Sequence, residues 1–303
     1  MPSTPWDLTG RTVLITGAAR GIGAEVARRL AARGARLALL DLDAVALEVV
    51  AADCPGSATF VADVTDADGL ADTVEEIVAH FGGLDVVMAN AGIAPVGMVR
   101  SMDPAAFERT IEINLLGVWR TVRACLPHIV ASRGYVLPVA SLAALVHAPG
   151  MAAYAASKAG VEAFADSLRN EVAHLGVDVG CAYFSWIDTP MVRGADATAI
   201  GGAMRGKLKG IVGKTYPVSA AAEAVALGIE RRASHVMAPG WIRVLLLLRG
   251  FMQPLTDLQA RGSAAEADRI AQTEVDARGA QAASRPVGEG GAAAMSGRLE
   301  VTR

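Results

Sequence analysis

Three side chains that can handle a proton lie close together in the middle of the chain. Tyr154 and Lys158 are four residues apart, and Ser141 precedes the tyrosine by thirteen residues. On a helix, a spacing of four places tyrosine and lysine on one face, one turn apart. A free phenol titrates near roughly pH 10, so it needs a cation or hydrogen bond beside it to work at neutral pH. The three residues therefore predict proton transfer to or from a carbonyl or alcohol, with Tyr154 as acid/base, Lys158 as its activator and Ser141 polarising the reacting oxygen.

A glycine-rich turn stands far upstream, directly after the apolar run of residues 11–16. Gly17 lets the chain leave a strand in a conformation barred to residues with a Cβ. Gly21 and Gly23 let the start of the next helix approach a pyrophosphate, which the first N–H groups and the helix dipole attract. The turn predicts a dinucleotide site. Its members are Gly17, Arg20, Gly21, Ile22 and Gly23.

The choice of dinucleotide depends on Asp41, which ends the second apolar run. A carboxylate at this place accepts both hydroxyls of the adenosine ribose of NAD and repels the 2′-phosphate of NADP. Arg20 favours the opposite choice because a cation beside the turn can hold that phosphate. Leu42, directly after Asp41, supplies no cation. The sequence therefore predicts NAD as cofactor, with NADP as the alternative.

Strand and helix patterns alternate along most of the chain. The expected strands cover residues 11–16, 37–40, 58–62, 84–89, 135–140, 177–184 and 235–238. The expected helices cover residues 21–33, 66–80, 103–131, 150–175 and 218–231. This alternation predicts an α/β fold, a doubly wound parallel sheet of Rossmann type with helices on both faces. Ligands bind such sheets at the carboxyl ends of the strands. The polar residues expected there are Asp41, Asp63, Asn90, Ser141 and Ser185.

Taken in order, six motifs of the chain resemble those of the short-chain dehydrogenase/reductase family, over about residues 9–240. They are Thr16-Gly17-x-x-x-Gly21-x-Gly23, Asp63-Val64, Asn90-Ala91-Gly92, Asn114, Ser141 and Tyr154-x-x-x-Lys158. The resemblance implies an NAD(P)-dependent oxidoreductase that acts on a small alcohol or ketone. The catalytic residues that it implies are Asn114, Ser141, Tyr154 and Lys158. In this scheme Asn114 anchors a water that links Lys158 to solvent, and Lys158 also holds the nicotinamide ribose.

The same resemblance assigns further residues to the cofactor. Asp63 and Val64 would lie beside the adenine, and residues 90–92 would form the turn over the adenosine ribose. Thr189 would hold the nicotinamide amide, and Ile187 would lie beside the cofactor as well.

The chain departs from the family pattern in three places. Ser185 and Trp186 stand where the family usually has Pro-Gly, so Trp186 could form a wall of the pocket. Pro138 removes a ladder donor from an expected buried strand, which predicts a bulge. Ala89 replaces a common first Asn before Asn90.

A substrate pocket is expected next to the catalytic group. Its candidate residues are Ala143, His147, Met151, Trp186, Met191 and Val192. Residues 191–215 are rich in Gly and Ala and predict a mobile lid or substrate loop.

The C-terminal part of the chain breaks the alternation. Residues 241–252 read WIRVLLLLRGFM, which is too short and too charged to span a bilayer. They predict a helix packed on its own domain or on a second subunit, or an interfacial helix with weak membrane contact. We therefore expect a dinucleotide-binding and catalytic domain over residues 1–240 and a helical extension over 241–277. A disordered tail is expected over 278–303, where Ala, Gly, Gln, Ser and charge predominate.

Composition excludes several classes of protein. A net charge of -3 gives no general attraction to nucleic acid. The three cysteines are far apart and show no metal-ligand spacing, so we expect no metal site and a reducing compartment. Residues 1–10 lack the pattern of a signal peptide, so a cytoplasmic protein is expected.

Together these features predict hydride transfer between NAD and a secondary alcohol or ketone, which the apolar extension suggests is hydrophobic. The resemblance implies a homodimer or homotetramer built through the helices that carry Asn114 and Tyr154. Two alternatives stay open: a non-catalytic cofactor-sensing or scaffold protein of the same fold, and a membrane-surface reductase of lipid-like substrates.

Overall fold

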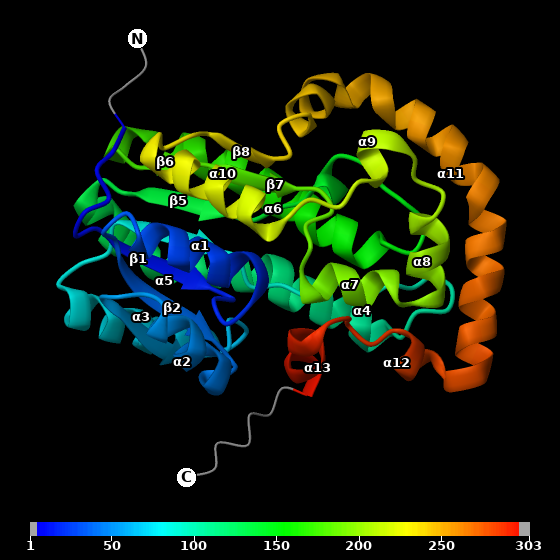
Figure 1. Cartoon of the computed structure of the whole chain (residues 1–303), viewed down its shortest axis with the longest axis horizontal. Helices are drawn as coiled ribbons and strands as arrows, with labels where there is room; N and C mark the ends of the chain where they lie inside the picture. Colours follow the sequence, from blue (N-terminus) through cyan, green and yellow to red (C-terminus); the bar gives the residue numbers. More distant parts are fainter. Residues whose placement is uncertain (1–4, 297–303) are drawn as a thin grey trace.

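Parallel strands flanked by helices form the centre of the molecule (Figure 1). The structure is a computed structural model, and it describes residues 5–296. For residues 251–263, 292–293 and 296 the description covers the backbone alone. The strands are β1 (Thr12–Thr16), β2 (Arg36–Asp41), β3 (Ser57–Val61), β4 (Val86–Ala89), β5 (Tyr135–Pro138), β6 (Asp178–Val179), β7 (Cys181–Phe184) and β8 (His235–Ala238). Six of them form one sheet in the order β3-β2-β1-β4-β5-β6, and β7 pairs with β8. The order reverses between β1 and β4, so the doubly wound fold class is confirmed.

Each face of the sheet has its own hydrophobic core because successive residues of a strand point to opposite faces. Val13 and Ile15 of β1 pack in a core with the helices α1 (Gly21–Ala31), α2 (Ala44–Ala52) and α10 (Val218–Glu230). Leu14 packs in a second core with α3 (Ala67–Phe81), α5 (Gly117–Ser132) and α6 (Ala152–Val172). Burial on both faces explains why the strands are continuous apolar runs in the sequence. The helices up to α10 are α1 (Gly21–Ala31), α2 (Ala44–Ala52), α3 (Ala67–Phe81), α4 (Pro104–Ile111), α5 (Gly117–Ser132), α6 (Ala152–Val172), α7 (Pro190–Asp196), α8 (Ala199–Arg205), α9 (Gly210–Gly213) and α10 (Val218–Glu230).

Three expected elements differ in detail from the structure. A π-helix, η1 (Glu112–Leu116), interrupts the helix expected over residues 103–131 and separates α4 from α5. The strand expected over 177–184 is split at Gly180 into β6 and β7. Residues 191–215 contain the short helices α7, α8 and α9, where a loop was expected.

Pro138 interrupts the hydrogen-bond ladder of β5 without adding a residue to it. The Gly180 N–H donates to the Val136 carbonyl at 2.9 Å, and the Ala140 N–H donates to the Ala182 carbonyl at 2.8 Å. Between these two bonds Pro138 has no N–H to donate, and the neighbouring strand breaks there. The pairing register is the same on both sides of the break. The expected bulge is therefore wrong, because the sheet accommodates the missing donor by splitting the adjacent strand.

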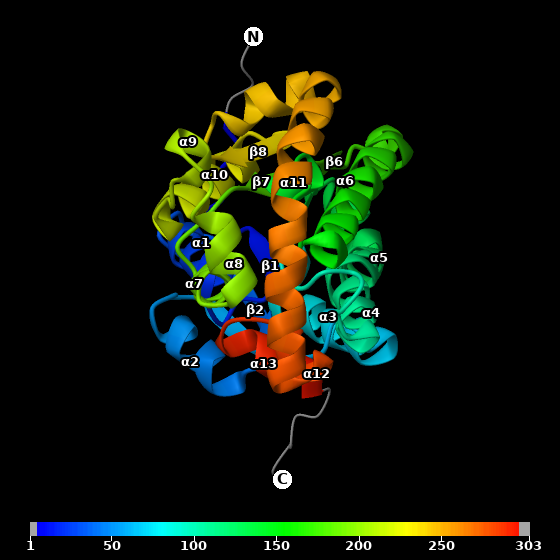
Figure 2. The same cartoon turned by 90° about the vertical axis from the view of Figure 1, so that its right-hand side faces the viewer.

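A long helix, α11 (Ile242–Arg278), follows β8 and runs past the carboxyl ends of the strands, beside α8 (Figures 1 and 2). Ion pairs join it to the rest of the protein along its length. They are Arg249–Glu162 (3.0 Å), Lys207–Glu266 (2.5 Å) and Arg100–Asp268 (2.7 Å). Ala271, on the same helix, is buried against Val96 and Ile200. None of the helices in the described part of the chain has the length and apolar character needed to cross a bilayer.

The segment after α11 also has defined structure, which differs from the disordered tail expected over residues 278–303. It contains α12 (Ala280–Ala283) and α13 (Glu289–Ser296), which lie below α7 in Figure 1. Ser284 and Ala294 are buried in this segment. Composition alone indicated disorder because it carries no information on packing against helices that are far away in the sequence. Residues 297–303 lie outside the described part of the chain.

Candidate active site

The glycine turn between β1 and α1 has the backbone geometry that a phosphate cradle needs. Gly17 has φ +68° and Gly21 has φ +57°, a region that residues with a Cβ rarely adopt. At Gly23 a Cβ would overlap the carbonyl oxygen of Gly17, so this position also requires glycine. No side chain caps the start of α1, which leaves its first N–H groups available to an anion. The turn therefore fits the pyrophosphate of a dinucleotide.

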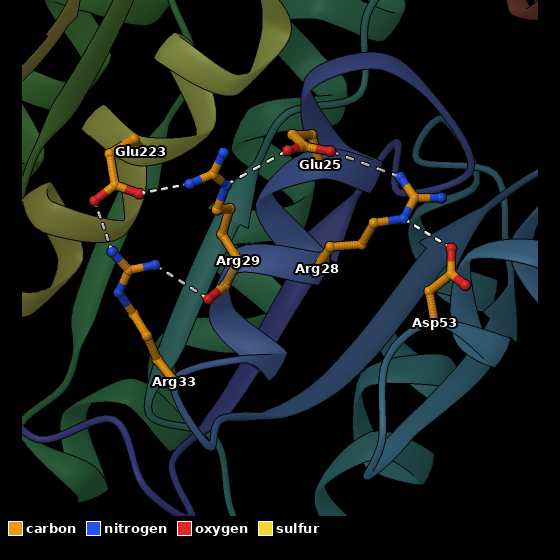
Figure 3. A network of polar contacts seen from close by, with 6 residues as sticks. All are labelled: Glu25, Arg28, Arg29, Arg33, Asp53 and Glu223. Atoms are coloured by element: carbon orange, nitrogen blue, oxygen red, sulfur yellow. Dashed lines mark hydrogen bonds and ion pairs between the residues drawn. The ribbon is translucent and has the colours of Figure 1, made fainter.

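The exposed side of α1 is held by a network of six charged residues (Figure 3). Arg29 and Arg33 both pair with Glu223 of α10, at 3.0 and 2.8 Å. On the other side Arg28 pairs with Asp53, just after α2, at 2.9 Å, and Glu25 of α1 pairs with Arg28 and Arg29. Single exposed ion pairs add little stability, but a network that joins three helices restrains the helix whose first turn forms the cradle.

Asp41 lies at the end of β2 with its carboxylate held by backbone donors. The N–H groups of Ala19 (3.1 Å) and Leu42 (2.8 Å) donate to its two oxygens. The neighbouring Arg20 makes an ion pair with Asp43, with 2.5 Å between Nη2 and Oδ2. Asp43 caps α2 by accepting a hydrogen bond from the Ala46 N–H, and this bond and Arg20 both lower the pKa of Asp43. The cation that could have held a 2′-phosphate is therefore partly neutralised by its own neighbour.

At the far end of the site, Asp63 is held by hydrogen bonds from both sides. The Thr65 N–H and hydroxyl donate to its Oδ1, each at 2.8 Å, and Arg109 donates to its Oδ2 at 3.3 Å. Nearer the turn, the Asn90 amide donates to the carbonyl oxygens of Thr16 (3.0 Å) and Gly17 (3.2 Å). Asn90 thus fixes the glycine turn from the end of β4.

Ser141, Tyr154 and Lys158 come together past the end of β5. Ser141, which begins a short 3-10 turn, lies close enough to Tyr154 for its hydroxyl to lower the pKa of the phenol. The Lys158 ammonium lies 5.7 Å from the centre of the Tyr154 ring and donates to the Val139 carbonyl at 2.8 Å. The spacing of four residues on α6 therefore brings the two side chains to one site.

Burial dominates the electrostatics of Tyr154. It raises the pKa of the phenol, and the Ser141 hydroxyl lowers this pKa by less. Burial also lowers the pKa of Lys158 to about 8. The Lys158 ammonium donates to the Val139 carbonyl, and the activation of Tyr154 by Lys158 stays a prediction.

Asn114 lies in the π-helix η1, completely buried, where the wider turn moves its side chain toward β4. Its Oδ1 accepts from the Ile93 N–H at 2.8 Å, and its Nδ2 donates to the Ile93 carbonyl at 2.9 Å and the Ser157 hydroxyl at 3.1 Å. A Cβ on Gly92 would lie 3.1 Å from Asn114 Oδ1 and 3.6 Å from Lys158 Nζ. Gly92 therefore leaves room for both side chains.

A cavity of about 200 Å³ follows the cradle along the carboxyl ends of the strands. The predicted residues that line it are Gly17, Arg20, Gly21, Ile22, Asp41, Asp63, Val64, Asn90, Ala91, Gly92, Thr189 and Met191. Gly23 lies inside the turn, Ile187 is buried behind the site, and Thr189 caps the start of α7. Among the described residues, no group of three or more His, Cys, Asp or Glu side chains could hold a metal ion.

The cavity has a wall that the sequence did not reveal. Residues 287–291 and Ala294, from the C-terminal segment, line it together with the predicted residues. The only sequence signal was the glycine-rich run Gly288, Gly290, Gly291, which composition alone assigned to a disordered tail.

The six candidates for the substrate pocket lie in several surroundings. Met151 packs with Val96 and Ile200, and Trp186 lies under the Arg205 guanidinium, 4.1 Å from the ring centre. The Ala143 N–H donates to Ser141 Oγ at 3.1 Å, and the Val192 N–H donates to Thr189 Oγ1 at 3.3 Å. His147 is exposed, and Met191 lines the cofactor cavity.

The family model for short chain dehydrogenases matches residues 11–199, more than half of the chain. The chain belongs to the short-chain dehydrogenase family. Helices α11 to α13 of this short-chain dehydrogenase lie outside the matched residues.

Similar proteins include several dehydrogenases. A cis-4-hydroxycyclohexanecarboxylate dehydrogenase of Sinomonas cyclohexanicum is 37% identical over 75% of this chain and 92% of its own. The 11-beta-hydroxysteroid dehydrogenase 1A of Arabidopsis thaliana is 32% identical over 80% of this chain and 72% of its own.

Solved structures of the same family are also similar. The crystal structure of levodione reductase matches with a TM-score of 0.73 and 27% identity, over 78% of this chain and 99% of its own. A short chain dehydrogenase from Mycobacterium paratuberculosis, solved bound to NAD, matches with a TM-score of 0.69 and 28% identity, over 76% of this chain and 97% of its own.

Proposed function

We propose that this oxidoreductase transfers a hydride between NAD and a secondary alcohol or ketone, with Tyr154 as the acid/base. The observation that carries the proposal is that Tyr154 lies beside both Ser141 and Lys158, past the end of β5, at the same edge of the sheet as the dinucleotide cradle. When bound, the nicotinamide supplies or accepts the hydride.

The side chains of the site divide the proton chemistry between them. In reduction, the Tyr154 hydroxyl donates its proton to the carbonyl oxygen, which the Ser141 hydroxyl also binds. Burial raises the pKa of Tyr154, so the phenol stays protonated at neutral pH and is ready to act as an acid. In oxidation the same oxygen must first lose its proton, which requires a higher pH or a cation moved closer. Lys158, 5.7 Å from the Tyr154 ring centre, is the cation within reach.

The preference for NAD over NADP rests on the charges around the adenosine ribose. Asp41 presents a carboxylate that backbone N–H groups hold in place, and this carboxylate would repel a 2′-phosphate. Arg20, the cation beside it, is paired with Asp43. Both features favour the two free hydroxyls of NAD.

The substrate class follows from an apolar cluster beside the site. Met98, Met151 and Met204 pack against buried Val96 and Ile200. Methionine side chains are flexible and adapt to irregular apolar shapes. The names of two similar dehydrogenases also describe hydroxyl groups on saturated rings. We therefore infer an apolar cyclic alcohol or ketone as substrate.

A panel of cyclic ketones and alcohols, tested with NAD(H) and NADP(H), examines this function directly. At least one pair should show turnover in the wild type. Tyr154→Phe should then lower kcat by about 10²–10⁴-fold, the usual contribution of a general acid/base, while the Kd for NADH changes little. A Tyr154→Phe enzyme with wild-type turnover would show that another group carries the proton. Tight cofactor binding without turnover of any compound would instead favour the non-catalytic cofactor sensor.

A second candidate, action at a membrane surface, is favoured by apolar side chains on the first turns of α11. Val244, Leu247 and Leu248 are exposed, with Leu247 79% accessible. On a helix these three positions share one face. A double variant with Leu247→Glu and Leu248→Glu should lose binding to anionic liposomes in co-sedimentation if this face contacts lipid. Equal sedimentation of wild type and variant would mean that this face does not contact lipid, and would favour packing against a second copy of the chain.

A further inference from the structure

The C-terminal segment of the chain crosses the cavity that the proposed cofactor would occupy. Residues 284–295, named here the C-terminal strap, follow α12 and include most of α13. Residues 287–291 and Ala294 of the strap line the cavity opposite the glycine turn, Asp41 and Asp63. In Figure 1 this segment lies below α7, which its helix α13 contacts.

Three contacts anchor the strap at its two ends. The Ser284 hydroxyl accepts a hydrogen bond from the Asp103 N–H at 3.0 Å, and Ser284 is only 2% exposed. At the other end, Arg109 Nε donates to the Ala294 carbonyl at 2.9 Å. Met295 packs beside the buried Met102, Ala106 and Ala153. Several independent contacts thus hold the strap to α4 and its surroundings.

The middle of the strap approaches the cofactor residues so closely that it needs glycine. Gly288 has φ +83°, and a Cβ there would lie 3.0 Å from the Met191 nitrogen and the Pro190 carbonyl oxygen. A Cβ on Gly290 would lie 2.9 Å from Arg20 Nη1. The strap therefore touches α7 on one side of the cavity and Arg20 on the other.

The adenine end of the site is tied to the strap by one guanidinium. Arg109 binds Asp63 (3.3 Å) and Thr65 (3.0 Å) with its two terminal nitrogens, while its Nε holds Ala294. Movement of Asp63 toward a ligand would therefore shift Arg109 and its hydrogen bond to the strap. Movement of the strap would in turn free Arg109 Nε.

The space left under the strap is small for a dinucleotide. The cavity measures about 200 Å³. Sites for drug-sized ligands typically measure roughly 300–1,000 Å³, and a dinucleotide is at the upper end of such ligands. With the strap in this place, the cavity therefore offers less room than a dinucleotide needs.

We propose that the C-terminal strap is an autoinhibitory element that must leave the cofactor cavity before a dinucleotide can enter. The identity of the ligand in this proposal rests on the proposed function, whereas the contacts of the strap do not depend on it. A closed strap reduces the fraction of molecules that can bind, so the apparent Kd rises by the inverse of that fraction.

The first test compares the full chain with a chain that ends at Ala283 and with Gly288→Val, whose added side chain would push the strap off α7. Both variants should bind NADH about tenfold more tightly and faster, the change expected if about one molecule in ten has an open strap. Stopped-flow fluorescence measures the association rate. Gln281→Ala, an exposed position on α12, is the control and should match the wild type. Unchanged or weaker NADH binding by both strap variants would overturn the proposal.

The second test needs no cofactor. Hydrogen exchange of residues 17–23 and 63–65 should be faster in both strap variants than in the full chain, since the strap covers these segments. Equal exchange in all proteins would mean that the strap does not cover the site. Failure of every protein to bind NADH or NADPH would overturn the proposed function, while the exchange result would still decide the strap.

Discussion

The proposed cofactor half and the proposed substrate half of the site are built in different ways. Around the glycine turn, polar atoms and backbone meet at fixed distances, as in the bonds from Asn90 to Thr16 and Gly17. Around Met151, by contrast, the contacts are apolar and involve flexible side chains such as Met98 and Met204. The first half can hold one ligand shape with precision. The second can adapt to several, which suits a family that keeps one cofactor chemistry and varies its substrates.

The two halves should also respond differently to mutation. In the cofactor half one added carbon atom meets backbone that cannot move, whereas in the substrate half a similar change meets side chains that can repack. Mutations with matched controls can therefore measure the difference.

The largest effect is expected at Gly23. A Cβ from Gly23→Ala would overlap the Gly17 carbonyl and force the turn open. NADH affinity should fall by about a hundredfold or more, because the phosphate cradle loses its shape. Gly240→Ala is the matched control: no atom lies within 4 Å of its added Cβ, and affinity should not change. Fluorescence titration gives both values, and thermal unfolding shows that each variant is folded. A Gly23→Ala protein that binds like the wild type would mean that the turn is not the cradle.

Next in size is Lys158→Met, with opposite effects on activity and stability. Turnover should fall by about 10²-fold or more, since the cation near Tyr154 is lost. At pH 7 the free energy of unfolding should rise by about 1–3 kcal/mol, because an apolar side chain replaces a charge that is costly to bury. Lys158 is only 3% exposed, and its pKa is lowered to about 8.

The stability gain of Lys158→Met should depend on pH. The pKa of Lys158 is lowered to about 8 in the folded wild type, whereas the unfolded chain keeps the proton up to the ordinary lysine pKa of 10.5. Wild-type stability from this group therefore rises between these two pH values. The advantage of the methionine variant should be largest below pH 8 and shrink as the pH approaches 10.5. A constant difference in denaturant unfolding from pH 7 to 10 would contradict the buried charge.

Much of the fold could be predicted from the sequence because its signals are local. The apolar runs of the strands and the glycine turn each occupy a few consecutive residues, and burial on both faces of the sheet makes the strands easy to recognise. The four-residue spacing of Tyr154 and Lys158 is equally local, and the structure brings both to the end of β5 beside Ser141.

What the sequence could not show depends on distant contacts. The widened turn at Asn114 arises within an ordinary helical pattern, and no residue type marks it. The pKa of Tyr154 depends on its burial and on the Ser141 hydroxyl beside it, and the spacing of the residues gives neither. The composition of the strap predicts disorder, yet hydrogen bonds of Ser284 and Arg109 attach the strap to the domain.

A moderate effect is expected where the cofactor half chooses between dinucleotides. Asp43→Asn removes the carboxylate that neutralises Arg20, while asparagine still caps α2 as well as aspartate does. The freed Arg20 should raise kcat/KM with NADPH by about tenfold relative to NADH, roughly the value of one charge-assisted hydrogen bond. Asp53→Asn is the control, since it removes an ion pair of α1 that lies outside the cavity. An unchanged NADPH/NADH ratio in Asp43→Asn would show that Arg20 does not reach the 2′ position.

The smallest effect is expected in the substrate half, from Met204→Leu. Leucine has nearly the same volume and polarity as methionine, so the cluster around Val96 and Ile200 should repack at a cost below about 1.5 kcal/mol. Its branched, stiffer side chain adapts less well to different shapes. We expect NADH affinity and kcat for the best substrate to stay within about twofold, while KM values across a panel of cyclic ketones spread by a few-fold. Steady-state kinetics on the panel measure this. If Met204→Leu instead weakened NADH binding as strongly as Gly23→Ala, the two halves would be mechanically coupled, and the division between a rigid cradle and an adaptable pocket would fail.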